Sequence, residues 1–154
     1  MSTTGRGLSR RDLATWVRFT SGLSALIQAL DCRLRDESGL SVDDFGVLRA
    51  VWAAPKSGIP MSELADELSF SVSRLTHVMQ RMESKGWVQR RTLDEDKRVK
   101  MVSLTDKGRQ RFRDAWPSHA EAIRELFLDQ LTDDDRISIE NTFSRIRKNL
   151  RRNG

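Results

Sequence analysis

The sequence is poor in the residues that build disulfides, metal sites and membrane spans. Its 154 residues include one cysteine, two histidines, three prolines and no tyrosine. A single cysteine, Cys32, cannot form an internal disulfide framework, and two distant histidines offer no ligand-spaced cluster for zinc. No run of about 18 apolar residues occurs, and the start lacks the apolar segment of a signal peptide. We therefore expect a cytoplasmic chain with no membrane contact, no metal and no cofactor.

Motifs of the common enzyme classes are also missing. The sequence contains no GxSxG elbow, no phosphate-binding loop and no pair of catalytic carboxylates on one short element, so an enzyme is not expected. The length suits one compact domain, or one small domain carried on dimerising helices. A composition with 32% charged and 38% hydrophobic residues is ordinary for a folded, soluble protein.

The net charge of +5 is unevenly placed along the chain. Residues 70–100 carry 8 basic and 4 acidic side chains, whereas residues 1–69 carry 8 and 9. Such a concentration is the electrostatic footprint of an element that contacts nucleic acid. A charge run alone is more often a solvated loop, so the surrounding elements must decide between the two.

Apolar spacings of three and four predict a long amphipathic helix between Leu13 and Leu34, which Gly39 should end. Ser41 is then the expected N-cap of a second helix over residues 42–54, with two aspartates in its first turn. Residues 55–60, "PKSGIP", predict a loop.

Two shorter helices follow, joined at residues 69–71. A join this short predicts a helix-turn-helix, whose second helix can enter a major groove. Gly86 should end that second helix. Its inward face is expected to consist of Leu75, Val78, Met79 and Met82, and its outward face of Ser73, Arg74, Thr76, His77, Gln80 and Arg81.

The strand-like segments "WVQRRT" and "VKMVSL" flank the charged run and predict a β-hairpin, or wing. Thr105 restarts a helix, which Pro117 should kink or break at Trp116. Thr132 should cap the last helix, whose apolar stripe has little left to pack against in a small domain. A second copy of the chain is the expected partner. The stripe comprises Ile139, Phe143, Ile146 and Leu150.

The run "SELADELSFSVSRLTHVMQRMESKGWVQR…DEDKRVKMVSLTDKG" resembles the MarR family of winged helix-turn-helix transcriptional regulators. The likeness lies in the "SRLTH" recognition-helix pattern and in the Asp-x-Arg wing pattern that ends in Leu-Thr-x-x-Gly, and it extends over nearly the whole chain. It implies a mainly α fold with a small β-hairpin wing. It also implies a winged helix-turn-helix DNA-binding domain at residues 41–105 and a helical dimerisation region at residues 1–40 and 106–154.

The resemblance further implies a homodimeric repressor that binds a palindromic operator in double-stranded DNA and is released by a small phenolic or anionic ligand. Ser71, Ser73, Arg74 and His77 would contact the major groove, and Arg81 would contact a phosphate. Gln80 lies on the same outward face and is a further candidate for DNA contact. Arg98 of the wing would enter the minor groove, with Asp96 orienting its guanidinium. Phosphate affinity independent of sequence would come from Arg90, Arg91, Lys97 and Lys100.

Three other interpretations stay open at this stage. In one branch of the family a cysteine of the first helix senses peroxides, but Cys32 lies near the end of its helix and the chain has no tyrosine to hydrogen-bond a thiolate. A buried cysteine that packs as a small hydrophobe is the expected case. The winged domain could instead be a protein–protein interaction module with an acidic partner. Finally, aromatic side chains could line a ligand pocket, although aromatics at helical spacing usually form core. The aromatic residues in question are Trp16, Phe19, Trp52, Phe112 and Trp116.

Overall fold

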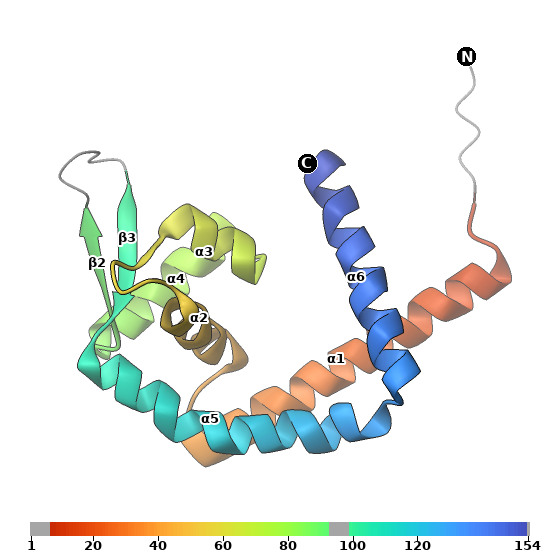
Figure 1. The fold of residues 1–154 in the computed structure, drawn as a ribbon, viewed down its shortest axis with the longest axis horizontal. Helices are drawn as coiled ribbons and strands as arrows, with labels where there is room; N and C mark the ends of the chain where they lie inside the picture. The colour runs from red at the N-terminus through yellow and green to blue at the C-terminus, as the bar shows by residue number, and fades with distance from the viewer. Residues whose placement is uncertain (1–6, 93–98, 154) are drawn as a thin grey trace. The chain divides into compact units, whose positions relative to one another are not determined.

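The computed structural model describes residues 7–92 and 99–153, which are mainly α-helical with one small antiparallel sheet (Figure 1). This confirms the predicted fold class. The chain divides into two compact units, residues 1–119 and residues 120–154, and helix α5 (Asp106–Leu126) runs from the first into the second. Within the described residues, no helix is both long and apolar enough to cross a membrane.

Helix α1 (Arg10–Ser38) begins and ends at well-formed caps. The Ser9 side chain accepts a hydrogen bond from the Asp12 N–H at 3.1 Å, and the Asp12 carboxylate accepts one from the Ser9 N–H at 3.1 Å. The helix ends at Gly39, which has a left-handed φ of 64°, as predicted. Only Leu30 and Leu34, near this end, are buried, so most of the apolar stripe of α1 is exposed.

Helix α2 (Val42–Ala53) begins with a capping box in which Ser41 accepts from the Asp44 N–H at 3.1 Å. A second N–H group at this terminus has a partner from another helix, because the Asp31 carboxylate of α1 accepts from the Val42 N–H at 2.8 Å. Two of the four N–H groups that a helix start leaves unpaired are thereby satisfied. Asp31 thus ties α1 to the start of α2.

The helix-turn-helix consists of α3 (Met61–Leu68) and α4 (Val72–Ser84), as predicted. Ser69, with a left-handed φ of 53°, ends α3, and the Ser71 hydroxyl caps α4 by accepting from the Arg74 N–H at 3.2 Å. The four apolar side chains expected inside are all buried, and each contributes roughly 1.5–3 kcal/mol to stability. Burial on this scale fixes which face of α4 is turned outward.

The sheet has the order β1–β3–β2. β2 (Val88–Thr92) pairs with β3 (Lys100–Leu104) as the predicted hairpin, with Val88 opposite Leu104. On its other edge β3 pairs with β1 (Ile59–Pro60), where Ile59 lies opposite Val102. The loop prediction over residues 55–60 was wrong for the last two residues. A two-residue strand is too short to show a periodic pattern, and an edge strand tolerates the proline.

The Leu-Thr-x-x-Gly motif joins the sheet to α5. The Thr105 hydroxyl accepts from the Gly108 N–H at 3.0 Å and donates to the Gly86 carbonyl at 2.6 Å. Gly108 lies against the backbone of Trp87, where an added Cβ would come within 1.9 Å of the carbonyl oxygen. Only glycine fits this contact.

Pro117 lies inside α5, and the helix continues past it to Leu126, so the expected break at Trp116 does not occur. Proline removes one helical hydrogen bond, but α5 is held by buried side chains on both sides of it, Phe112 and His119. The second unit contains a short 3₁₀ turn, η1 (Leu128–Gln130), and α6 (Asp133–Asn153). The predicted cap of α6 is confirmed, because the Thr132 hydroxyl accepts from the Asp135 N–H at 3.2 Å.

Candidate nucleic-acid interface

The outward face of α4 is polar and open to solvent. Because the opposite face is buried, all six α4-region side chains that the sequence assigns to DNA are exposed together. They are Ser71, Ser73, Arg74, His77, Gln80 and Arg81. Hydroxyl, amide, imidazole and guanidinium groups on one exposed helix face can meet both base edges and phosphates.

The basic residues of the wing strands are either exposed or bound to a carboxylate. Arg91 and Lys100 are exposed on β2 and β3. Arg90 is half-buried, and its Nε donates to Oε1 of Glu83 at 2.8 Å, so the wing is tied to the end of α4. The other wing residues assigned to DNA lie outside the described residues, and their roles stay predictions. They are Asp96, Lys97 and Arg98.

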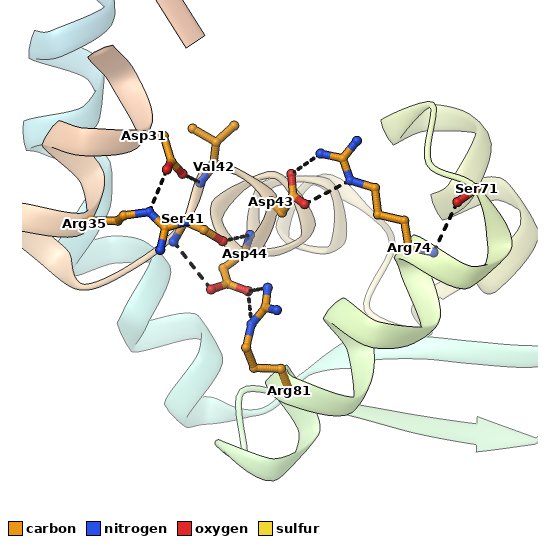
Figure 2. A network of polar contacts seen from close by, with 9 residues as sticks. All are labelled: Asp31, Arg35, Ser41, Val42, Asp43, Asp44, Ser71, Arg74 and Arg81. Carbon is orange, nitrogen blue, oxygen red and sulfur yellow. Dashed lines mark hydrogen bonds and ion pairs between the residues drawn. The ribbon is translucent and has the colours of Figure 1, made fainter. Parts of the chain in front are cut away.

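Arg74 is held by a carboxylate of α2 (Figure 2). Its Nε donates to Oδ2 of Asp43 at 3.0 Å and its Nη2 donates to Oδ1 at 2.7 Å. The Phe70 ring lies 4.3 Å from the Arg74 Cζ, a cation–π distance. The Asp43 hydrogen bonds raise the pKa of the Arg74 guanidinium, although partial burial opposes this.

Arg81, two turns further along α4, contacts the neighbouring acid. Its Nε and Nη2 both donate to Oδ1 of Asp44, at 3.1 and 2.6 Å. The Asp44 side chain is 4% exposed and the Arg81 side chain 43%. The sequence explained Asp43 and Asp44 only as favourable charges at a helix start. Their contacts with α4 arise from tertiary packing, which no local pattern in the sequence signals.

A third acid, Asp31, completes this polar network at the start of α2 (Figure 2). The Arg35 Nε donates to Oδ2 of Asp31 at 2.6 Å, while Oδ1 accepts from the Val42 N–H. The Arg35 hydrogen bond, and secondly that of Val42, lower the pKa of the Asp31 carboxyl. The network therefore links α1 to α2 through the Asp31–Val42 hydrogen bond, and α2 to α4 through the Asp43–Arg74 and Asp44–Arg81 pairs.

An open groove with a volume of about 1040 Å³ runs beside this network. Its lining combines apolar residues of α1, such as Leu23 and Ile27, with the charged residues of the network and Lys85. None of the five aromatic residues considered for a ligand pocket lines this groove. Trp52 and Trp116 both lie near Phe112, whereas Trp16 contacts Phe19 on α1.

The two histidines differ in surroundings. His77 is exposed on α4, whereas His119 is buried, with its ring centroid 4.2 Å from that of Phe45. Burial lowers the pKa of His119. Its Nδ1 has no hydrogen-bond partner within the described part of the chain. Nor do three or more His, Cys, Asp or Glu side chains of residues 7–92 and 99–153 gather where a metal ion could be held.

Cys32 is exposed on α1, so the expectation of a buried cysteine was wrong. That expectation rested on how often a lone cysteine packs as a small hydrophobe, and not on its position in α1. Cys32 is not part of the apolar stripe of this helix, whose buried members are Leu30 and Leu34.

Comparison with known proteins places this geometry among bacterial regulators. Residues 31–115 match the family described as "Transcriptional regulator SarA/Rot". The MarR family regulator Sco3205 from Streptomyces coelicolor, in complex with DNA, is 28% identical with a TM-score of 0.90, over 97% of this chain and 93% of Sco3205. AbsC, a second MarR family regulator of that organism, is 27% identical with a TM-score of 0.87, over 95% and 98%.

Among curated relatives, the uncharacterised HTH-type regulator YdgJ of Bacillus subtilis is 27% identical over 113 residues, 73% of this chain and 67% of YdgJ. The chain spans about half to two thirds of the length of the first curated relatives that it matches.

Proposed function

The chain belongs to the MarR family of winged helix-turn-helix transcriptional regulators, with the SarA/Rot pattern over residues 31–115, and we propose that it is a homodimeric repressor. As a dimer it binds a palindromic operator and is released by a small phenolic or anionic ligand. Residues 41–105 form the DNA-binding domain, and residues 1–40 and 106–154 form the dimerisation region.

The observation that carries DNA binding is the exposed polar face of α4. Four buried apolar side chains turn it outward, and the exposed Arg91 and Lys100 of the wing lie on the strands that follow. A recognition helix reads base edges from such a face, while flanking basic residues contact phosphates. The DNA complex of the relative Sco3205 supports the same assignment.

Dimerisation is proposed from the exposed apolar residues of α1 and α6. A monomeric soluble protein rarely exposes a long apolar stripe to water, and a second copy of this chain is the simplest partner that would bury it. Two α4 helices related by a two-fold axis then address two half-sites. The exposed residues of α1 are Leu13, Trp16, Val17, Phe19, Leu23 and Ile27, and those of α6 are Ile137, Phe143, Ile146 and Leu150.

The wing is proposed to add contacts outside the major groove. Arg98 enters the minor groove, where a guanidinium suits the strongly negative potential, and Asp96 fixes its direction. Lys97 supplies phosphate affinity beside Arg91 and Lys100. Arg90 has the same assignment, but its contact with Glu83 makes it less available than Arg91 and Lys100.

The groove beside α1 and α2 is the proposed binding site of the small ligand that releases the protein from its operator. Its lining combines apolar side chains with four cations, Arg35, Arg74, Arg81 and Lys85, and three carboxylates, Asp31, Asp43 and Asp44. The excess of one positive charge favours a small anion with an apolar body. A ligand bound there would disturb the acid–arginine pairs that connect α2 to α4.

The proposal is tested by titrating the purified protein with duplex DNA over a range of salt concentrations. Arg91→Gln and Lys100→Gln should each reduce the slope of log affinity against log salt by about 0.9, one phosphate contact each. Arg18→Gln, which removes an exposed charge from α1, is the matched control and should leave the slope unchanged. Equal slopes for all four proteins would contradict the proposed face.

A further inference from the structure

Asp43 contacts the one arginine of α4 that the sequence assigns to base contact. It lies in the first turn of α2, and its side chain is 27% exposed, whereas that of Arg74 is 55% exposed. The carboxylate grips the guanidinium side-on, through Nε and Nη2, and the Phe70 ring covers one face of the group. The arginine is therefore held in one direction without any DNA present (Figure 2).

The side-on grip does not use the part of the guanidinium that reads bases. A guanidinium carries five N–H donors in a fixed plane, of which Asp43 takes one on Nε and one on Nη2. The other hydrogen of Nη2 and one hydrogen of Nη1 form the end-on fork. This fork matches the O6 and N7 acceptors of guanine in the major groove, the commonest specific arginine contact. Contact with Asp43 and contact with a guanine are therefore compatible.

The position of Arg74 in α4 favours a base over a phosphate as its target. It is the third residue of the helix, and the N-terminal residues of a recognition helix are the ones that contact base edges. Arg81, the other arginine of α4, is bound differently. Its Nε and Nη2 both donate to a single oxygen of the buried Asp44 carboxylate.

We propose that Asp43 is a positioning residue that fixes Arg74 to read a guanine in each half-site, and so determines specificity. This inference rests on the proposed operator binding. Holding the side chain beforehand removes an ordering cost from binding. The carboxylate also disfavours phosphate at the same place, so it weakens binding to the wrong sequences. Both effects raise the ratio of operator to non-specific affinity.

The test compares wild-type protein with Asp43→Asn, Asp43→Glu and the control Glu67→Gln. Glu67 pairs with Arg49 at 3.0 Å, so its variant removes the same charge without touching Arg74. Dissociation constants are measured for the operator and for a random duplex, and each guanine of the half-site is replaced in turn by 7-deazaguanine, which lacks N7. Circular dichroism checks folding, which the Ser41 and Asp44 cap should preserve in every variant.

We expect Asp43→Asn to weaken operator binding by roughly fivefold to tenfold, within the range of one bidentate base contact. Its affinity for random duplex should exceed that of Glu67→Gln, because the carboxylate that disfavours phosphate beside Arg74 is absent. One 7-deazaguanine position should weaken the wild type, have no effect on Arg74→Ala and have a reduced effect on Asp43→Asn, with partial rescue in Asp43→Glu. Tighter operator binding by Asp43→Asn, or an undiminished 7-deazaguanine effect, would overturn the positioning role. A wild-type protein that binds operator and random duplex equally would overturn the proposed function instead.

Discussion

Arg81 and Asp44 form an ion pair in which the carboxylate is buried and the guanidinium is partly exposed. Nε and Nη2 of Arg81 both donate to Oδ1 of Asp44, and Oδ2 of the same carboxylate accepts from the Ser41 N–H at 3.5 Å. Asp44 is therefore shared between the cap of α2 and the link from α2 to α4. A residue assigned to a phosphate contact also holds the recognition helix in place.

Replacing Arg81 by alanine should destabilise the fold. The Asp44 carboxylate would remain buried without its counter-charge, at a cost on the order of 3 kcal/mol in the free energy of unfolding. Urea denaturation measures this, with Arg91→Ala as the control, because Arg91 is exposed and should change stability by less than about 0.5 kcal/mol. Equal losses in the two variants would show that the ion pair has no structural role.

Gly108→Ala should be strongly destabilising. The new Cβ would lie 1.9 Å from the Trp87 carbonyl oxygen, so α5 and the segment just before β2 must move apart, at a cost of roughly 1–3 kcal/mol or more. Gly22→Ala is the matched control, because no atom lies within 4 Å of its Cβ position and alanine favours a helix by about 1 kcal/mol. The midpoint temperature of thermal unfolding should be lower than that of the wild type for Gly108→Ala but not for Gly22→Ala. A lower midpoint for Gly22→Ala alone would contradict the close contact between Gly108 and Trp87.

Stability should fall on mild acidification because of His119. Burial lowers its pKa below the ordinary 6.5, so the unfolded state binds the proton more readily than the folded state. The contribution of neutral His119 to the free energy of unfolding is complete above about pH 6.5. It declines as the pH falls below that value, by at most about 1.4 kcal/mol per pH unit. Urea midpoints between pH 7.5 and 5.5 should show this slope in the wild type and in His77→Gln, and a smaller one in His119→Phe. Identical slopes in all three would exclude His119 as the cause.

The apolar stripe of α1 should carry the dimer. Trp16 is 59% exposed, and a glutamate at this position would place a charge in the proposed interface. We expect Trp16→Glu to raise the dimer dissociation constant by roughly tenfold or more, since buried tryptophans dominate such interfaces. Sedimentation velocity over a concentration series measures this, with Thr15→Glu on the exposed polar side of α1 as control. A wild-type monomer at every concentration would contradict the dimer.

The sequence predicted those features that depend on local patterns. Helix caps at Ser41 and Thr132, the end of α1 at Gly39 and the buried face of α4 follow from residue type and spacing, and the structure confirms them. The exposed face of α4 followed from its buried face, because a helix has only one outward side once the other is fixed.

The features that the sequence missed depend on contacts between distant segments. Asp43 and Arg74 are 31 residues apart, and Asp44 and Arg81 are 37 apart, so no periodic pattern connects them. Strand β1 exists because β3 offers it an unpaired edge. The exposure of Cys32 was missed because the expectation of burial came from residue type alone, which does not say on which side of α1 the thiol lies.

In vitro selection of bound duplexes from a random pool tests the central claim most directly. Wild-type protein should enrich an inverted repeat whose half-site centres lie about 10 base pairs, or a multiple of that, apart, as two α4 helices of a symmetric dimer require. Arg74→Ala should enrich a repeat that has lost its preference at one guanine in each half-site. Failure of the wild-type protein to enrich any repeat, under conditions where it remains folded, would contradict the account.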